Sequence, residues 1–150
     1  MTGAEKLSAK AKRILVVDDD HLVRASILDG LATAGFEILE ADNGQDCIRI
    51  LSREFVDAIV LDIIMPEMEG LEVITRLRKT HPNLKIVAVS GGGRTRNTDI
   101  LKAANKLGAD VTLNKPFDPI QLIGTVRSLL GLAAPSDGLD LFPTKGGFAL

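Results

Sequence analysis

The chain has 150 residues, of which 45% are hydrophobic, so it can bury the core of one domain but not of two ordinary ones. Its 18 basic and 20 acidic side chains are spread along the chain and leave a formal net charge of −2. Because no basic block is present to neutralise phosphates, direct binding of nucleic acid is not expected. Residues 1–11 contain lysines but no continuous apolar stretch, so we expect neither a signal peptide nor a membrane anchor, and a cytoplasmic location.

Five short apolar runs predict β-strands. In chain order they cover 14–17, 37–40, 58–61, 86–89 and 111–114. The first, third and fourth runs are continuous and rich in β-branched residues, which is typical of strands buried on both faces of a sheet. The second and fifth contain more polar positions, as strands at the edges of a sheet do. We therefore predict five strands, three of them central.

Apolar residues that repeat every three to four positions predict a helix after each strand. The first expected helix lies around Val23, Ile27 and Leu31 and ends before Gly35, and the second lies around Cys47, Ile48 and Leu51. The third begins after Pro66 and Gly70 and stops before Pro82, and the fourth ends before Gly108. The fifth runs from about Asp118, with Pro119 in the first turn, to about Leu130. Cys47 is the only cysteine, so it cannot form an internal disulfide, and its apolar setting indicates a buried, unreactive thiol.

This alternation predicts an α/β fold of the (βα)5 type, a doubly wound five-stranded parallel sheet in the flavodoxin-like strand order 2-1-3-4-5. The expected domain covers residues 12–131, after a flexible lead of residues 1–11. Residues 132–150 are rich in Gly and Pro and show no sustained periodicity, so we expect a disordered C-terminal tail. A short docking motif formed by apolar tail residues is the less favoured interpretation; these residues are Leu139, Leu141, Phe142 and Phe148.

Several aspartates follow two of the predicted central strands. Asp18, Asp19 and Asp20 come directly after 14–17, and Asp62 follows 58–61. The carboxyl ends of parallel strands meet at one edge, where several carboxylates repel one another unless a cation joins them. Oxygen ligands of this kind select a hard ion such as Mg²⁺. Asp20 is expected to cap the following helix. Capping needs only one aspartate, so it does not explain why Asp18, Asp19 and Asp62 also lie at the strand ends.

Two further polar residues end the fourth and fifth strands. Lys115 offers a mobile positive charge for a carboxylate or a phosphoryl oxygen, and Ser90 offers a hydroxyl that can hydrogen-bond such an oxygen. Catalysis by a serine nucleophile is not expected, because no histidine lies at a strand end opposite Ser90 to act as its base. His21 is expected at the surface where the first helix starts, and His81 is expected to be solvated.

Four motifs in order resemble a known family, the response-regulator receiver domain of two-component signalling. They are VVDDD at 16–20, VLDIIMPEMEGLEVI at 60–74, AVSGGG at 88–93 and NKPF at 114–117. The resemblance covers about residues 12–131. Any one motif is weakly specific, but four in this order, with 43 residues from Asp19 to Asp62 and 53 from Asp62 to Lys115, are highly specific.

The resemblance implies a role for each residue at the strand ends. Asp62 would be the phosphoacceptor, taking a phosphoryl group from a sensor histidine kinase, a histidine phosphotransfer protein or a small phosphodonor. Asp19 and Asp62 would ligate Mg²⁺ directly, Asp18 largely through water, and Ile64 through its backbone carbonyl. Lys115 would offset charge and Ser90 would move toward the phosphoryl group, switching the conformation that a downstream protein partner recognises. Such a domain catalyses only its own phosphorylation and dephosphorylation.

The chain departs from the family at the position three before the lysine, where a Tyr or Phe is usual and Thr112 is found. We expect Thr112 to be a solvent-side strand residue rather than part of a distinct switch. Ile64 lies two positions after Asp62, and Gly92 lies two positions after Ser90. Neither residue supplies a polar side chain to orient an attacking water. Intrinsic dephosphorylation is therefore not expected to be fast.

Other functions stay open on the residues alone. A Mg²⁺-dependent phosphohydrolase would use the same aspartates but needs a substrate-covering cap, and no insertion of that size is present. A flavodoxin-like module for a nucleotide or flavin lacks a phosphate-cradling glycine loop after the first strand and aromatic residues to hold a ring. A degenerate receiver would serve as a constitutive scaffold. The sequence does not separate a stand-alone regulator from a phosphorelay intermediate or a receiver belonging to a longer protein.

Overall fold

The computed structural model describes residues 11–64, 70–91 and 97–132, and the side chains of Asn97 and Thr98 lie outside this description. Within it, strands and helices alternate along the chain. The strands are β1 (Arg13–Val17), β2 (Glu37–Ala41), β3 (Ala58–Asp62), β4 (Lys85–Ser90) and β5 (Val111–Asn114). The helices are α2 (His21–Thr33), α3 (Gly44–Leu51), α4 (Gly70–Thr80), α5 (Asn97–Leu107) and α6 (Pro119–Leu129). The predictions of a flexible lead and a disordered tail lie outside the described residues.

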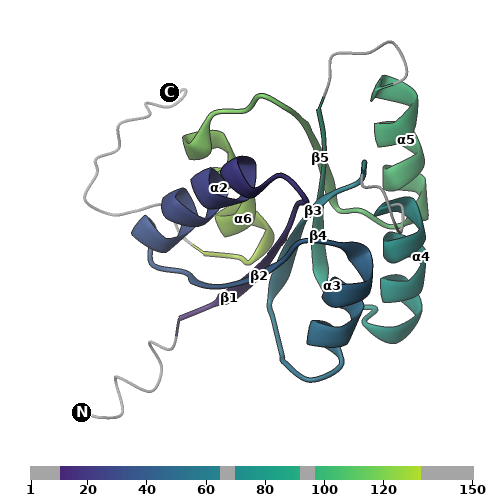
Figure 1. Cartoon of the computed structure of the whole chain (residues 1–150), viewed down its shortest axis with the longest axis horizontal. Coiled ribbons are helices and arrows are strands. Elements are labelled where there is room, and N and C mark those ends of the chain that lie inside the picture. The colour runs from purple at the N-terminus through teal and green to yellow at the C-terminus, as the bar shows by residue number, and fades with distance from the viewer. Residues whose placement is uncertain (1–10, 65–69, 92–96, 133–150) are drawn as a thin grey trace.

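The five strands form one parallel sheet in the order β2-β1-β3-β4-β5, which confirms the predicted strand order. Helices α2 and α6 lie on one face of the sheet, and α3, α4 and α5 lie on the other (Figure 1). The three central strands are almost entirely buried, whereas β2 and β5 each keep exposed or partly exposed positions. The polarity of the apolar runs therefore predicted the centre and the edges of the sheet correctly.

Each face of the sheet has its own apolar core. Leu15, Ile59 and Ile86 belong to the core beneath α3, α4 and α5, and Val16, Val60 and Val87 belong to the core beneath α2 and α6. Consecutive residues of a strand point to opposite faces, so a continuous apolar run serves both cores at once. Burial of these side chains is the main source of stability for the strand ends that carry the polar residues.

Capping residues lie at the helix ends where the sequence indicated them. The Asp20 side chain accepts hydrogen bonds from the backbone N–H groups of Leu22 and Val23, which confirms it as the N-cap of α2. Gly35 follows α2 with φ +99° and Gly108 follows α5 with φ +128°, values that favour glycine. Asp20 is therefore occupied by the helix, which separates it from its two neighbours.

Arg78 ties the loops at the amino ends of β4 and β5 together. Its guanidinium donates to the backbone carbonyl oxygens of Leu84 (2.6 Å) and Gly108 (2.9 Å) and pairs with Asp110 Oδ2 (2.9 Å). The same Asp110 oxygen accepts the backbone N–H of Ile86 at 2.7 Å. Nothing in the sequence marked Arg78, because its partners come from segments far along the chain.

Two expectations for single residues need correction. Thr112 is partly buried, and it pairs across the ladder with Ala88, whose side chain belongs to the core beneath α5. Because α5 covers this face of the edge strand, Thr112 does not lie on an open solvent side. His81 is also partly buried, because the end of α4 packs beside α3 and brings His81 Nε2 to 3.2 Å from the carbonyl oxygen of Leu51. His21, by contrast, is exposed at the start of α2 as predicted.

None of the helices among the described residues has the length and apolar character needed to cross a membrane.

Candidate functional site

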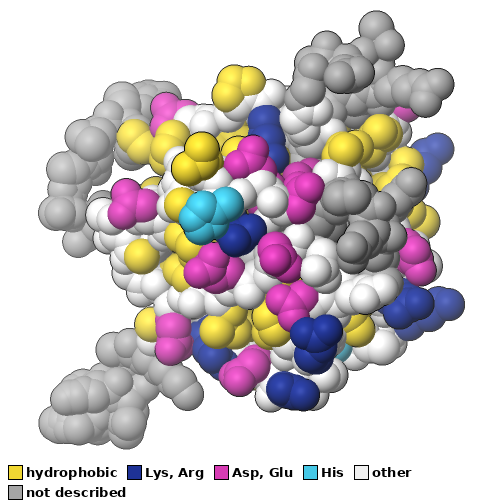
Figure 2. All heavy atoms as spheres, in the orientation of Figure 1, with side chains coloured by type: hydrophobic (Ala, Val, Ile, Leu, Met, Phe, Trp, Pro, Cys, Tyr) yellow, Lys and Arg dark blue, Asp and Glu magenta, His cyan; other side chains and the backbone are white. Residues whose placement is uncertain are grey.

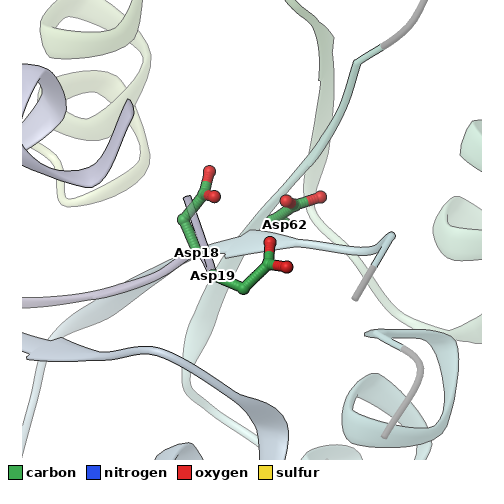
Figure 3. A group of neighbouring side chains, drawn as sticks. All are labelled: Asp18, Asp19 and Asp62. Atoms are coloured by element: carbon green, nitrogen blue, oxygen red, sulfur yellow. The ribbon is translucent and has the colours of Figure 1, made fainter. Parts of the chain in front are cut away.

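Three carboxylates meet at the carboxyl ends of β1 and β3. Asp18 and Asp19 follow β1, and Asp62 is the last residue of β3 (Figure 3). Each offers a carboxylate oxygen, and these three oxygens lie within 4.8 Å of one another. Figure 2 shows acidic side chains gathered near the middle of this face of the molecule. The parallel pairing of β1 with β3 brings together residues that are 43 positions apart in the sequence.

Asp62 is buried, with only 6% of its surface exposed. Its Oδ1 accepts the backbone N–H of Ile64 at 2.9 Å. Burial raises the pKa of Asp62 from its ordinary value of 3.8 to about 6; the Ile64 hydrogen bond and the charge of Lys115 oppose the rise, and the charge of Asp18 adds to it. At neutral pH Asp62 therefore carries a largely desolvated negative charge.

Lys115 lies between two of the carboxylates. Its Nζ donates to Asp18 Oδ2 at 2.8 Å and lies 3.5 Å from Asp62 Oδ2. Burial alone would lower the pKa of Lys115, but the hydrogen bond to Asp18 and the charges of Asp62 and Asp18 outweigh it and hold the pKa above 10.5. Lys115 thus stays protonated and offers a permanent positive charge beside Asp62.

The donor set fits a hard divalent cation. Within the described part of the chain, Lys115 is the one cation paired with this cluster, and it pairs with Asp18 and Asp62, so three carboxylates are served by a single ammonium group. Both oxygens of Asp18 already accept hydrogen bonds, one from Asp20 N–H at 2.9 Å and one from Lys115. Asp19 is exposed, and Asp62 has one oxygen turned toward Lys115. The exposed Asp19 is thus the most accessible of the three to a cation, and the assignment of Asp19 and Asp62 as direct ligands and of Asp18 as a ligand acting through water stays a prediction.

The remaining predicted residues lie at the same edge of the sheet. Ser90 is the last residue of β4, 1% exposed, and its carbonyl oxygen accepts the backbone N–H of Lys115 at 2.8 Å. Ile64 lies two residues beyond β3, and its backbone carbonyl as a metal ligand stays a prediction. The four strand ends thus come together as the sequence predicted, because β1, β3, β4 and β5 run parallel.

Arg24 is a member of the site that the sequence did not reveal. Its guanidinium donates to the backbone carbonyl oxygen of Asp18 at 2.6 Å and to Glu40 Oε1 at 2.9 Å, linking α2, the loop after β1, and β2. It also lies 3.3 Å from His21 Nδ1. Arg24 comes one turn into the helix that follows the acidic run, and that position was its only signal.

An apolar depression adjoins Lys115. It has a volume of about 510 Å³, and its lining includes Leu22 and Val23 of α2 together with Gly91 and Phe117. Leu22 is 78% exposed, so this rim of the charged site presents a large apolar side chain to solvent. A protein that approaches the carboxylates from this side would contact apolar surface first.

Comparisons with known proteins agree with this geometry. A family model described as the response regulator receiver domain matches residues 14–127. A response regulator MprA from Mycolicibacterium vanbaalenii is 36% identical over 126 residues, which cover 84% of this chain and 53% of that protein. A response regulator MprA from Mycobacterium leprae is 35% identical over 128 residues, with 85% and 55% covered. The chain spans about half the length of the curated relatives it matches.

Solved structures show the same likeness. A CheY-like response regulator receiver domain protein from Methanospirillum hungatei is 30% identical, with a TM-score of 0.75 over 81% of this chain and 95% of that one. The receiver domain of the Francisella response regulator 1452 is 28% identical, with a TM-score of 0.73 over 80% of this chain and 97% of that one. Fold, strand-end residues and similarity agree, and the chain belongs to the response regulator receiver domain family of two-component systems.

Proposed function

We propose that this receiver domain is switched by phosphorylation of Asp62 in a Mg²⁺-dependent reaction. One observation carries the proposal. A buried carboxylate, Asp62, lies beside a permanently charged lysine, Lys115, at an edge where two further carboxylates can hold a divalent cation. A structural ion pair needs one partner for Lys115, whereas this cluster holds three carboxylates, an excess of negative charge that supports a bound cation.

The reaction is a transfer of one phosphoryl group. An Asp62 carboxylate oxygen forms a bond to phosphorus while the bond from phosphorus to the donor's imidazole nitrogen breaks, and the electron pair stays on that nitrogen, which binds a proton. The product is an acyl phosphate on Asp62. Such transfers pass through a loose transition state, so positioning and charge neutralisation dominate over acid–base chemistry. The site is consistent with this demand, because the described residues place no histidine base against Asp62.

Each neighbour of Asp62 has a defined task in this proposal. Asp19 and Asp62, with Asp18 through water and the Ile64 carbonyl, would hold Mg²⁺. When bound, the ion supplies positive charge that offsets the charge of the phosphoryl oxygens. Lys115 exchanges its hydrogen bond to Asp18 for one to a phosphoryl oxygen, and it can do so because its Nζ already lies 3.5 Å from Asp62 Oδ2.

Ser90 would report the event. Its hydroxyl lies on the strand next to Asp62 and would hydrogen-bond a new phosphoryl oxygen, moving the segment that follows β4. Thr112 replaces the aromatic residue expected three positions before Lys115, so the surface of α5, β5 and α6 must signal without that side chain. The domain would therefore catalyse only its own phosphorylation and dephosphorylation and act by changing which protein partner it binds.

The phosphodonor in this proposal is a sensor histidine kinase or a histidine phosphotransfer protein in the cytoplasm. The exposed side chain of Leu22, in the apolar depression beside Lys115, supports a protein donor over a small molecule alone. A helix carrying a phosphohistidine would bury Leu22 as the imidazole phosphate approaches Asp62. Partner specificity would then depend on α2.

The direct test is intact-mass analysis after incubation with Mg²⁺ and acetyl phosphate or phosphoramidate. The wild type should gain the mass of one phosphoryl group, whereas Asp62→Ala should gain none. Asp29→Asn is the matched control, because Asp29 is an exposed carboxylate on α2 and should leave the gain unchanged. Failure of the wild type to gain mass with every donor would instead indicate a constitutive scaffold. Steady turnover of a phosphate ester, lost in Asp62→Asn, would indicate a phosphohydrolase.

A further inference from the structure

A second hollow lies at the opposite edge of the sheet from the carboxylates. It has a volume of about 610 Å³ and is formed by the loops that lead into β3 and β4 together with the end of α6. Its lining includes Arg53, Phe55, Leu84, Lys85, Leu129 and Leu130. We call it the basal groove. Its size falls within the range of about 300–1,000 Å³ that is usual for binding pockets.

The basal groove presents an aromatic side chain to solvent. Phe55 is 72% exposed, although large aromatic residues normally bury most of their surface. The loop is held in place, because the backbone carbonyl of Phe55 accepts a hydrogen bond from Arg13 Nη1 at 2.9 Å. The Phe55 side chain is therefore available on a positioned segment to contact a second apolar surface.

The unpaired charge of the basal groove is positive. Its two acidic residues are already engaged, since Glu54 pairs with Arg13 at 3.1 Å and Asp57 accepts the Arg13 N–H at 2.8 Å. Arg53 and Lys85 form no ion pair with any residue that the structure describes. The groove thus combines apolar surface with two available cations, which fits an occupant with acidic and apolar residues side by side.

The chain itself carries such a segment close by. Helix α6 ends at Leu129, Gly131 turns the backbone with φ +72°, and the described residues stop at Leu132, two positions after a residue of the groove wall. The segment 137–142 reads DGLDLF, with two aspartates beside Leu139, Leu141 and Phe142. Leu139 is seven positions after Leu132, a stretch that spans at most about 25 Å when extended.

We propose that residues 137–142 of this chain dock in the basal groove, with apolar side chains against Phe55 and Leu84 and with aspartates facing Arg53 and Lys85. A short tether gives an effective concentration on the order of millimolar, so even an intrinsic affinity near 1 mM would fill the groove about half of the time. The proposal concerns the edge remote from Asp62 and does not depend on the phosphorylation chemistry.

Paramagnetic relaxation in the full-length protein tests the docking. A nitroxide label on Thr144→Cys is placed two residues beyond the segment, and the native Cys47 does not compete for it because that thiol is fully buried. Amide signals of residues 52–55 and 83–85 should lose intensity, whereas those of the exposed surface of α5 should not. Uniform broadening, or broadening elsewhere, would overturn the proposal.

Two controls separate docking from mere proximity. The same label in a chain with Leu139→Ser, Leu141→Ser and Phe142→Ser keeps the tether length, so broadening that persists there would refute the docking. A mixture of labelled unenriched protein with unlabelled ¹⁵N protein should show no broadening. If the signals of groove residues broaden in the mixture as strongly as in the labelled protein, the occupant is a second copy and the intrachain proposal fails.

The charge contribution is tested by reversal. Arg53→Glu should reduce the broadening, and Asp140→Arg in that background should restore it, because the ion pair is re-formed with opposite sign. Lys102→Glu is the matched control, since Lys102 is an exposed cation on α5 away from the groove, and it should have no effect. Equal loss of broadening in Arg53→Glu and Lys102→Glu would show that net charge, and not docking, changes the signal.

Discussion

Replacing Asp62 by Asn should stabilise the metal-free protein at pH 8. Burial raises the pKa of the Asp62 carboxyl to about 6, so the folded chain holds a desolvated charge there that the unfolded chain leaves in water. The difference from its ordinary value of 3.8 corresponds to at most about 3 kcal/mol. Partial solvation of the site reduces the expected gain to about 1–2 kcal/mol.

The gain should depend on pH in a defined direction. A carboxyl whose pKa is higher in the folded state stabilises the fold below the unfolded pKa and loses that contribution as pH rises through the folded pKa. The wild type should therefore lose stability between about pH 4 and pH 6 from this group, whereas Asp62→Asn should not. At pH 4 the two proteins should differ little.

Urea unfolding followed by circular dichroism in EDTA, at pH 4.5 and pH 8, measures this effect. Asp29→Asn removes one exposed carboxylate on α2 and controls for net charge. Adding Mg²⁺ should stabilise the wild type by about 2.7 kcal/mol at one hundred times the dissociation constant, and Asp62→Asn by less. The reasoning would be refuted if Asp62→Asn were less stable than the wild type at pH 8, or if its free energy of unfolding exceeded that of the wild type by the same amount at both pH values.

Three other predictions address the lysine, the cysteine and the loops. Lys115→Met should slow phosphorylation of the domain by acetyl phosphate about 100-fold, measured as mass gain against time, because the phosphoryl oxygens lose a neutralising charge. Cys47 should react with a thiol reagent at pH 8 at least about 100-fold faster in urea than in buffer, since burial first and the charge of Asp46 second raise its pKa to about 12; rapid reaction of the folded protein would contradict this. Arg78→Met should lower the free energy of unfolding by about 1–3 kcal/mol, because it removes the ion pair with Asp110 and the donor to the Leu84 and Gly108 carbonyl oxygens, whereas Lys79→Met at the exposed neighbouring position should change it little.

Local sequence patterns were enough to predict the architecture. Continuous β-branched runs such as 14–17 and 58–61 are typical of strands covered on both faces, and the more polar runs are typical of strands at the edges. Short connections and right-handed crossovers then left few possible strand orders. The prediction was wrong where burial depends on a neighbouring helix, as at Thr112 beneath α5 and at His81 beside α3.

The gathering of Asp18, Asp19, Asp62, Ser90 and Lys115 at one edge was determined by the sequence, because each ends a strand and parallel strands end together. The tertiary structure decided which of these charged groups pair with one another. It placed the Lys115 ammonium on Asp18, and it added Arg24 as a link from the Asp18 backbone to β2. It also left the basal groove open with Phe55 exposed. These facts depend on contacts between segments distant in the chain, and the residue pattern of any one segment does not encode them.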